Sequence, residues 1–365
     1  KALAIALALA FLAQALTPSH RQTLPKAEQL AADLRQRIED TFFFTSSRNM
    51  FTLASQGYQP MGDRGLGGTP NISRNPVLSV KASGRVYLRG TALDTYNGRA
   101  WFDSLSNQRY SWQSPRFSGL KASLFNEELP EGDRVEPVTG SVTVLNPLPS
   151  TLFVPQRLRA LTLGPDMVAY FNASSEVFIT HDLEVGNSYS FRHEPYVAGE
   201  ARSDALAARL DQAGPAQMPE LDGAYLSLPG HLEAGGMVAN LAREAAGGAG
   251  SPYQQALALM RYLKGNYAYS LEVPDAPENL DFVSHFLFDT QRGYCTYFAS
   301  AMTVMARFLG LPARYVEGFL ARPGDAGSVV LTGLDAHAWT EVYIAGMGWV
   351  VFDATAPRPQ DGEQE

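Results

Sequence analysis

The sequence contains a single cysteine, Cys295, among 365 residues. One cysteine cannot form an internal disulfide or a cysteine-based zinc site, so a disulfide-stabilised scaffold is excluded. Positive charge is also in short supply, with 29 Lys and Arg against 37 Asp and Glu and a net charge of −8. An acidic chain offers no basic surface for the phosphates of nucleic acid. Cys295 is therefore either a structural thiol or a reactive one.

Motifs for nucleotides and metal ions are equally scarce. The sequence has no P-loop and no dinucleotide-binding fingerprint, because the glycines within residues 65–68 indicate only a flexible loop. Its histidines and cysteine show no paired metal-binding spacing, and no stretch supplies an EF-hand-like run of ligands. We therefore expect no cofactor, no metal ion and no nucleic-acid partner.

What the chain does have is a globular composition, with 45% apolar and 18% charged residues. Its length suggests about two to three domains. An apolar run over residues 2–13 falls short of the about 20 residues that cross a membrane. This run fits the end of a transmembrane helix, the core of a signal peptide or a buried helix. The first two interpretations place the remainder outside the cytoplasm, and we expect the N-terminal helix to anchor it to the membrane.

Changes of pattern along the chain predict five regions. Residues 1–40 form an apolar and helical N-terminal segment, and residues 41–75 form a linker or extended loop rich in Gly, Ser, Pro and Asn. Short alternating runs between turn residues predict a β-sandwich-like domain over residues 76–196. Helical patterns followed by strands predict a mixed domain over residues 197–357, which the motifs described below indicate to be the catalytic domain, and residues 358–365 form a polar tail.

A helix is predicted to begin at Cys295. Apolar residues recur on one face of residues 298–309, and Gly310 and Pro312 end the pattern. Unpaired N–H groups and the dipole at the start of a helix stabilise a thiolate. On helix position alone, a buried structural cysteine is an equally good interpretation.

Two strands that follow this helix are predicted to form a hairpin. Alternation places His337 on one face of the first strand together with Trp339 and Glu341, and residues 346–348 lead into a second strand that Asp353 closes. Taken singly, His337 fits a structural histidine and Asp353 a turn former. Together, a helix-start cysteine, a strand histidine and a strand-end aspartate supply the thiol, the base and the orienting group of nucleophilic catalysis.

At this point the sequence resembles a known family, the transglutaminase-like superfamily of papain-like folds. The resemblance covers about residues 250–357 and rests on four blocks in order: GYC with FA, RFLGLPARYVEG, HAWTEVY and GWVVFDAT. A looser resemblance over residues 87–104, YLRGTALDTYNGRAWFDS, is to the extracytoplasmic part of bacterial membrane-anchored transglutaminase-like proteins. The resemblance implies an α+β, papain-like core in which a helix bearing the cysteine packs on an antiparallel sheet bearing the histidine and the aspartate.

The resemblance also implies a role for each residue of the candidate triad. Cys295 would attack a glutamine carboxamide and form a thioester, and His337 would act as acid and then as base. Asp353 would fix the imidazole tautomer and stabilise the imidazolium. The backbone N–H of Cys295 is an expected oxyanion donor.

Four further residues are secondary candidates. Tyr269 and Gln291 are candidates for the second oxyanion donor, and His285 is a reserve candidate for the histidine. Trp339 is expected to wall a substrate tunnel or to pack in the core.

The predicted hairpin presents one geometric difficulty. If the chain turns at residues 346 and 347, Asp353 faces Thr340 rather than His337. An offset of three residues is roughly 10 Å. A different register, a bulge or strong twist must close this gap if Asp353 is the third member of the triad.

Three functions compete. The first is a protein-glutamine transferase that joins the carboxamide carbonyl to a primary amine, the second a peptidase or amidase that uses the same residues with water, and the third a binding scaffold without catalysis. A drier acyl-enzyme site favours transfer. We expect the partners to be protein or peptide substrates, including proteins of the cell envelope. Some animal members of the family need calcium, and we expect this chain to be independent of it.

Overall fold

The computed structural model describes residues 50–58, 65–104, 108–125, 135–165, 167–210 and 222–358. The predicted N-terminal segment 1–40 and residues 359–365 of the predicted polar tail lie outside these residues. Within the described ranges, no helix combines the length and the apolar character that a membrane span requires.

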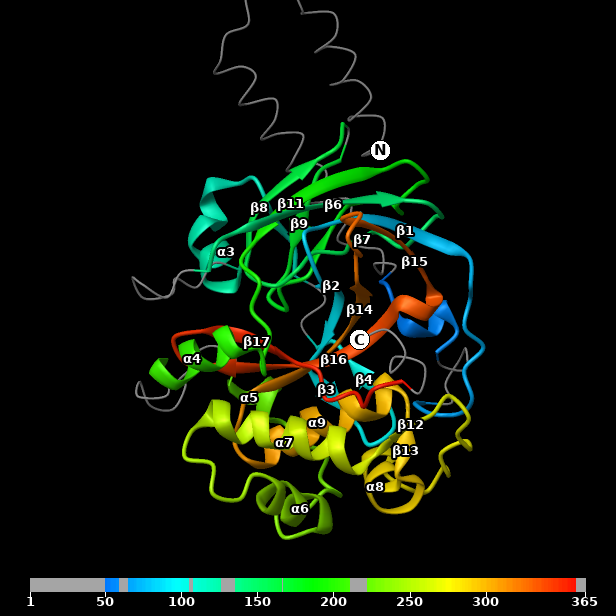
Figure 1. The fold of residues 1–365 in the computed structure, drawn as a ribbon, viewed down its shortest axis with the longest axis vertical. Coiled ribbons are helices and arrows are strands. Elements are labelled where there is room, and N and C mark those ends of the chain that lie inside the picture. The colour runs from blue at the N-terminus through cyan, green and yellow to red at the C-terminus, as the bar shows by residue number, and fades with distance from the viewer. Residues whose placement is uncertain are drawn as a thin grey trace, which may run out of the picture. The chain divides into compact units, whose positions relative to one another are not determined.

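A four-stranded antiparallel sheet forms the centre of the C-terminal half (Figure 1). Its strands follow the order β17-β16-β14-β2, with β17 at Gly348–Phe352, β16 at Ala336–Ile344, β14 at Ala313–Ala321 and β2 at Val86–Leu93. All nine residues of β14 are buried, and β2 and β16 pair with its two edges. This strand is therefore enclosed on both faces and both edges.

Helix α9, Cys295–Phe308, packs on β14 and β16. Gly310, with a φ of 76°, follows its end, and Pro312 comes two residues later. The helices α6 and α7 pack against α9 (Figure 1). The α-helices of the described residues are α3 Ser118–Phe125, α4 Ala201–Leu210, α5 Asp222–Leu226, α6 Met237–Ala245, α7 Pro252–Asn266, α8 Phe282–His285 and α9. The predicted α+β class, with the cysteine helix packed on an antiparallel sheet, is confirmed.

The turn-rich part of the chain forms a second, five-stranded antiparallel sheet. Its order is β15-β1-β6-β11-β8, with β15 at Ser328–Thr332, β1 at Pro76–Lys81, β6 at Val138–Val144, β11 at Ser188–His193 and β8 at Leu158–Leu163. A smaller sheet has the order β5-β9-β10-β7, with β5 at Tyr110–Ser111, β9 at Tyr170–Phe171, β10 at Val177–Phe178 and β7 at Thr151–Leu152. Two two-stranded ribbons, β3 Thr95–Tyr96 with β4 Trp101–Phe102 and β12 Ala268–Tyr269 with β13 Arg292–Gly293, complete the strands of the described residues.

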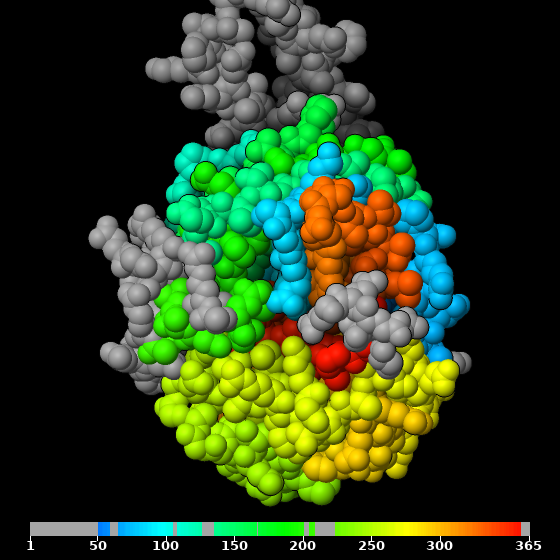
Figure 2. All heavy atoms as spheres, viewed as in Figure 1, coloured from blue at the N-terminus to red at the C-terminus, as the bar shows by residue number. Residues whose placement is uncertain are grey.

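The two large sheets exchange strands across residue 196, where sequence patterns place a domain boundary. Strand β2 comes from the predicted β-sandwich-like region and pairs with β14. Strand β15 comes from the predicted catalytic region and pairs with β1. In the space-filling view, the C-terminal residues in red show as a narrow band between the helices in yellow and the strands in blue and orange (Figure 2). Residue 196 therefore marks a change of pattern in the sequence, but each large sheet contains strands from both sides of it.

The predicted linker over residues 41–75 is corrected for the part that the structure describes. Phe51, Leu53 and Tyr58 are fully buried, and a short 3₁₀ helix occupies Leu53–Gln56. The N–H of Leu53 donates to the carboxylate of Glu317 on β14 at 2.8 Å. Because the Gly, Ser and Asn around them dominate the local composition, these few apolar anchors are easily overlooked in the sequence.

A glycine permits the close pairing of β2 with β14. At Gly318 the register shifts, and an added Cβ would collide with the carbonyl oxygen of Leu88. Only glycine therefore allows the two backbones to approach at this irregularity.

A buried ion cluster connects three strands of the fold. The carboxylate of Glu341 on β16 accepts from Arg314 on β14 at 2.6 and 2.8 Å and from Arg89 on β2 at 3.2 Å. The guanidinium groups also donate to the carbonyls of Ser174 and Ser175. Glu341 and Arg314 are fully buried, so each charge depends on the others for compensation.

Glu341→Gln is expected to lower the free energy of unfolding by about 3 kcal/mol or more, because it leaves two buried guanidinium groups without their shared carboxylate. Urea unfolding of the two proteins measures this difference. Glu200→Gln is the matched control, since Glu200 forms an exposed ion pair with Arg85. It should change stability by less than about 1 kcal/mol. Equal losses in the two variants would contradict the structural role of the cluster.

Candidate active site

Cys295 is the first residue of α9, as the sequence predicts. Its predecessor Tyr294 has extended backbone angles and occupies the N-cap position. The first N–H groups of a helix lack intrahelical acceptors and carry the positive end of the dipole. The free thiol is fully buried, and negative charge on its sulfur would be favoured by these amides.

The start of α9 is held by contacts with the segments around it. The Tyr294 hydroxyl donates to the Tyr58 carbonyl at 2.6 Å and lies 3.2 Å from the carbonyl of Gly68. Gly293 lies against the ring of Tyr297, where a Cβ would collide with that ring. The segment before Cys295 is thus fixed by tight packing as well as by hydrogen bonds.

His337 and Asp353 meet at the end of the central sheet where β16 begins and β17 ends. The His337 Nε2 lies 2.9 Å from Asp353 Oδ2. The thiol of Cys295 is within hydrogen-bonding contact of the same imidazole. Because Nε2 faces Asp353, Nδ1 is the ring nitrogen available to the thiol. The structure therefore brings the three predicted residues together.

The hairpin register resolves the geometric difficulty posed by the sequence. Ile344 pairs with Gly348 and Thr340 with Phe352, so the loop holds three residues rather than two. Continued by one residue, this register brings Asp353 opposite Trp339, which shares a strand face with His337. The remaining offset of two residues lies along one face, and the side chains span it. The predicted pairing of Asp353 with Thr340 is wrong by one residue.

The charges of the pair shift the pKa values of both groups. Burial by itself lowers the pKa of His337, but the carboxylate of Asp353 and the contact with Cys295 outweigh it and raise that pKa to about 9. Burial raises the pKa of Asp353, yet the His337 charge and hydrogen bond hold it well below its usual range. At neutral pH the pair is therefore an imidazolium and a carboxylate.

Tyr87 on β2 is a member of the site that the sequence does not reveal. Its hydroxyl donates to Asp353 Oδ2 at 2.8 Å, while the N–H of Thr355 donates to Oδ1 at 3.0 Å. The Tyr87 ring also packs edge-on against Trp339, with centroids 5.3 Å apart. Burial and the Asp353 charge raise the pKa of Tyr87 well above its ordinary value, so the hydroxyl stays a donor. The sequence signal for it is that Tyr87 opens the stretch of looser resemblance, residues 87–104.

Two threonines fix the cysteine helix to the histidine strand. The hydroxyls of Thr303 on α9 and Thr340 on β16 lie 2.9 Å apart. Both hydroxyls also lie within hydrogen-bonding distance of the Ala299 carbonyl, at 2.8 and 2.9 Å, so their two protons serve three close contacts. These hydrogen bonds fix where α9 lies along β16. They therefore also fix the position of Cys295 relative to His337.

The secondary candidates have different surroundings. Tyr269 on β12 lies beside Gly293, two residues before Cys295, whereas Gln291 is exposed. His285 on α8 pairs with Asp289, Nδ1 to Oδ2 at 2.9 Å, instead of entering the triad. Trp339 is buried, stacks beside His337 and lies with its indole nitrogen 3.4 Å from Glu341, so it packs in the core.

Side chains that could bind a metal ion do not cluster in the part of the chain that the structure describes. In the described ranges, no three His, Cys, Asp or Glu side chains lie together as a metal site would need. The expected independence from calcium and other cofactors stays a prediction.

Comparison with known proteins relates part of the chain to a family. Residues 239–354 match the family model of the Transglutaminase-like superfamily. A curated Pseudomonas aeruginosa protein named protein-glutamine gamma-glutamyltransferase is 38% identical over 99 residues, which are 27% of this chain and 14% of that protein. The Bacillus subtilis uncharacterized protein YebA is 26% identical over 304 residues, which are 80% of this chain and 40% of that protein. The chain therefore spans less than half the length of these two relatives.

Solved structures show the same fold. The crystal structure of the periplasmic domain of TgpA from Pseudomonas aeruginosa matches with a TM-score of 0.55 at 21% identity, over 77% of this chain and 87% of that chain. The ethylmercury-bound form of that domain matches with a TM-score of 0.56 at 20% identity, over 80% and 94%. The family model over residues 239–354 and these structures agree on the fold, so the predicted mixed fold of helices and antiparallel sheet is confirmed as transglutaminase-like.

Tyr87 and Asp353 are expected to be energetically coupled. A hydrogen bond to a charged group contributes about 1.5–3 kcal/mol, so Tyr87→Phe should destabilise the wild-type protein far more than it destabilises an Asp353→Asn background. A double-mutant cycle by urea unfolding gives the coupling, expected at about 1 kcal/mol or more. Tyr110→Phe in both backgrounds is the control, because Tyr110 lies on β5 outside this network. Additive effects of Tyr87→Phe and Asp353→Asn would remove Tyr87 from the site.

The pKa of His337 also predicts a pH dependence of stability. A folded-state pKa of about 9, above an unfolded-state value of about 6.5, means that the folded chain holds this proton more tightly. The resulting stabilisation is complete below about pH 6.5 and is lost as the pH rises through about 9. Urea unfolding at a series of pH values should therefore show the stability advantage of wild type over His337→Gln shrinking across this window. An advantage that stays constant would exclude the ion pair.

Proposed function

We propose that the chain is a cysteine-dependent acyl transferase of the transglutaminase type. The observation that carries the proposal is the contact of Cys295, at the start of α9, with an imidazole that Asp353 holds at 2.9 Å. The similarity to a protein named protein-glutamine gamma-glutamyltransferase supports the same reaction. This arrangement provides a nucleophile, an acid and base, and an orienting carboxylate.

In the proposed acylation step, the Cys295 thiolate attacks the carbonyl carbon of a glutamine carboxamide. The carbonyl oxygen takes up the negative charge and accepts from the backbone N–H of Cys295. As the carbonyl re-forms and the C–N bond breaks, the imidazolium of His337 gives its proton to the leaving nitrogen. Ammonia departs, and the acyl group remains as a thioester on Cys295.

In the second step, a primary amine attacks the thioester carbonyl. Neutral His337 takes a proton from the attacking nitrogen, the C–S bond breaks, and the thiolate returns beside the imidazolium. Asp353 keeps the imidazole oriented and stabilises its positive charge in both steps. Tyr87 and the N–H of Thr355 hold the carboxylate in place.

Burial of the site favours transfer over hydrolysis. Cys295 is fully buried, and the side chain of His337 is only 6% exposed. Water is a poor competitor for an acyl group held in such surroundings, and exclusion of water prevents hydrolysis of a reactive intermediate. Hydrolysis through the same thioester, as in an amidase or peptidase, is the alternative outcome of the assay below.

The proposed setting is outside the cytoplasm, with anchoring through the N-terminal segment. The structurally similar TgpA domain is described as periplasmic, and this supports the assignment. Substrates there would be proteins or peptides of the cell envelope that offer a glutamine and a primary amine.

Cys295→Ala is expected to abolish both amine incorporation and ammonia release from a glutamine-containing protein, with a loss of at least about 1,000-fold. Incorporation of a fluorescent primary amine and release of ammonia, measured side by side, test this. Thr303→Val is a structural comparison, because it disturbs the attachment of α9 without removing the thiol.

Activity that survives Cys295→Ala would refute the thiol mechanism. Ammonia release without any incorporation at high amine concentration would establish the hydrolase instead of the transferase. Incorporation that saturates with amine while ammonia release continues in step with it would support the transferase.

A further inference from the structure

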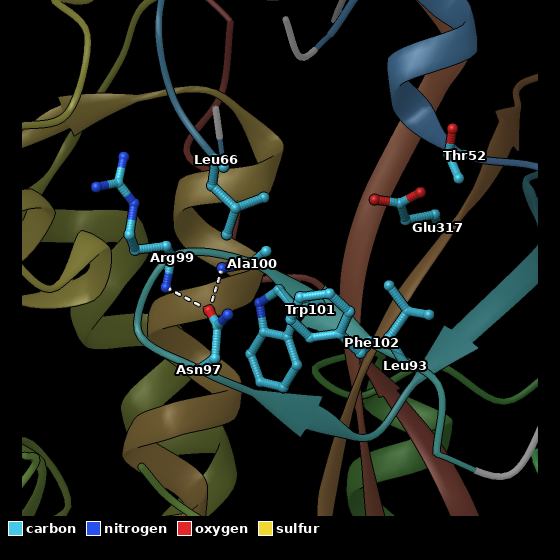
Figure 3. A pocket seen from close by; sticks show the side chains of 10 residues that line it. Thr52, Leu66, Leu93, Asn97, Arg99, Ala100, Trp101, Phe102 and Glu317 are labelled. Atoms are coloured by element: carbon cyan, nitrogen blue, oxygen red, sulfur yellow. Dashed lines mark hydrogen bonds between the residues drawn. The ribbon is translucent and has the colours of Figure 1, made fainter. Parts of the chain in front are cut away.

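A pocket of about 390 Å³ opens beside the sheet that carries the candidate triad (Figure 3). Its volume falls within the range of ordinary small-molecule sites. Its lining comes from the segment before β1, the end of β2, the β3–β4 hairpin and β14. It consists of Thr52, Gly65, Leu66, Leu93, Asn97, Arg99, Ala100, Trp101, Phe102 and Glu317. The proposed mechanism uses none of these residues.

The pocket holds one buried carboxylate, that of Glu317. This residue is 3% exposed, and it accepts from the Leu53 N–H at 2.8 Å and from the Tyr315 hydroxyl at 3.1 Å. Neither donor carries a positive charge, so the carboxylate has no cation among these partners. Burial raises its pKa to about 7. A cation placed beside it would favour the ionised form.

Aromatic side chains form the wall next to this carboxylate. The indole of Trp101 is buried and stacks on Tyr315 with centroids 5.3 Å apart, while Phe102 is 49% exposed at the rim. Aromatic faces attract alkylammonium groups. The Arg307 guanidinium already lies 5.2 Å from the centroid of the Trp101 ring, so Phe102 is the lining aromatic that offers an exposed ring to a ligand. The other charged lining residue, Arg99, points its guanidinium away from Glu317 and donates to the Glu278 carbonyl (Figure 3). The lining is therefore mixed, with polar side chains as well as apolar and aromatic ones, and Glu317 is the one carboxylate among the lining residues.

The pocket carboxylate lies close to the candidate triad. On β14, Glu317 pairs with Ala338, and the next residue, Gly318, pairs with His337. The Glu317 side chain therefore shares a sheet face with Ala338 and Thr340, the face on which Thr303 of α9 packs, and not with His337. Tyr315 donates to Glu317, and its hydroxyl lies near enough to Cys295 that charge on the thiol raises the pKa of the phenol. Tyr315 is thus hydrogen-bonded to the pocket carboxylate and lies within electrostatic range of the nucleophile.

We infer that this pocket binds the alkylammonium end of the acyl acceptor, with the carboxylate of Glu317 as its counter-ion. The inference rests on the proposed acyl transfer and names the residue that selects the acceptor. A glutamine carboxamide is neutral and gains nothing from a buried anion, whereas a primary amine at neutral pH is a cation. Glu317 concentrates that cation beside the thioester and takes one proton from it, which frees the lone pair of the nitrogen. The neutral amine then attacks the thioester, and His337 takes the second proton as the C–S bond breaks.

The probe for this pocket is choline, a quaternary ammonium that cannot attack a thioester. Choline should inhibit amine incorporation by the wild-type protein in competition with the amine and not with the glutamine substrate. Its uncharged isostere, 3,3-dimethylbutan-1-ol, should inhibit at least about tenfold more weakly. Glu317→Gln keeps the size and one acceptor oxygen but removes the charge. It should weaken choline inhibition by about tenfold or more and raise the KM for charged amines.

Glu184→Gln is the matched control, since Glu184 is exposed in a turn before β11, and it should leave choline inhibition unchanged. Equal inhibition by choline and its neutral isostere, or choline inhibition that survives Glu317→Gln, would overturn the assignment. Competition with the glutamine substrate instead of the amine would overturn it as well.

Binding measured without chemistry separates this inference from the proposed function. Cys295→Ala protein should still bind choline in an NMR titration, and Cys295→Ala/Glu317→Gln protein should bind it at least about tenfold more weakly. Choline binding that depends on Glu317 in a protein without transferase activity would refute the proposed reaction but keep the cation pocket. Active transferase with no Glu317-dependent binding would refute the pocket alone.

Discussion

The burial of β14 is the constraint on which the rest of the structure depends. A strand enclosed on both faces must pair its backbone groups on both edges, because an unpaired buried N–H or C=O is costly. Strand β16 meets this need on one edge and β2 on the other. Strand β16 follows β14 closely in the sequence, but β2 comes from the turn-rich region far upstream. The fold therefore brings part of that region into the catalytic sheet.

This pairing determines what surrounds the triad. Tyr87 on β2 donates to Asp353, so the upstream region helps to orient the carboxylate of the candidate triad. Arg89 on the same strand donates to Glu341 and balances its buried charge. The low-dielectric interior makes each of these contacts matter, since an unpaired charge there has no water to stabilise it. A region that resembles an accessory β-domain in the sequence is thus structurally inseparable from the candidate active site.

The local patterns of the sequence predict local structure well. The amphipathic and capping signals locate α9 with Cys295 at its start, and alternating residues indicate β1, β6, β11 and the β16–β17 hairpin. These local patterns do not indicate which strands pair with each other. The periodicity of β2 does not show that it pairs with β14. The sequence between β16 and β17 does not show whether the hairpin loop has two or three residues. The position of Asp353 is sensitive to that difference, because one residue of register reverses the face of every side chain. Tyr87 and Glu317 escaped prediction for the same reason: their roles depend on strand neighbours, and each looks ordinary within its own segment.

The two anionic groups near Cys295 differ because their partners differ. Asp353 faces an imidazole that can carry a full positive charge, and this partnership keeps the carboxylate ionised despite burial. Glu317 faces only a backbone amide and a phenol, and burial raises its pKa to about 7. A carboxylate already paired with a cation has little to offer a second one, whereas an unpaired carboxylate gains from any cation that reaches it. The same central sheet therefore holds one carboxylate paired with an imidazolium in the candidate triad and a second, Glu317, whose hydrogen-bond donors carry no positive charge.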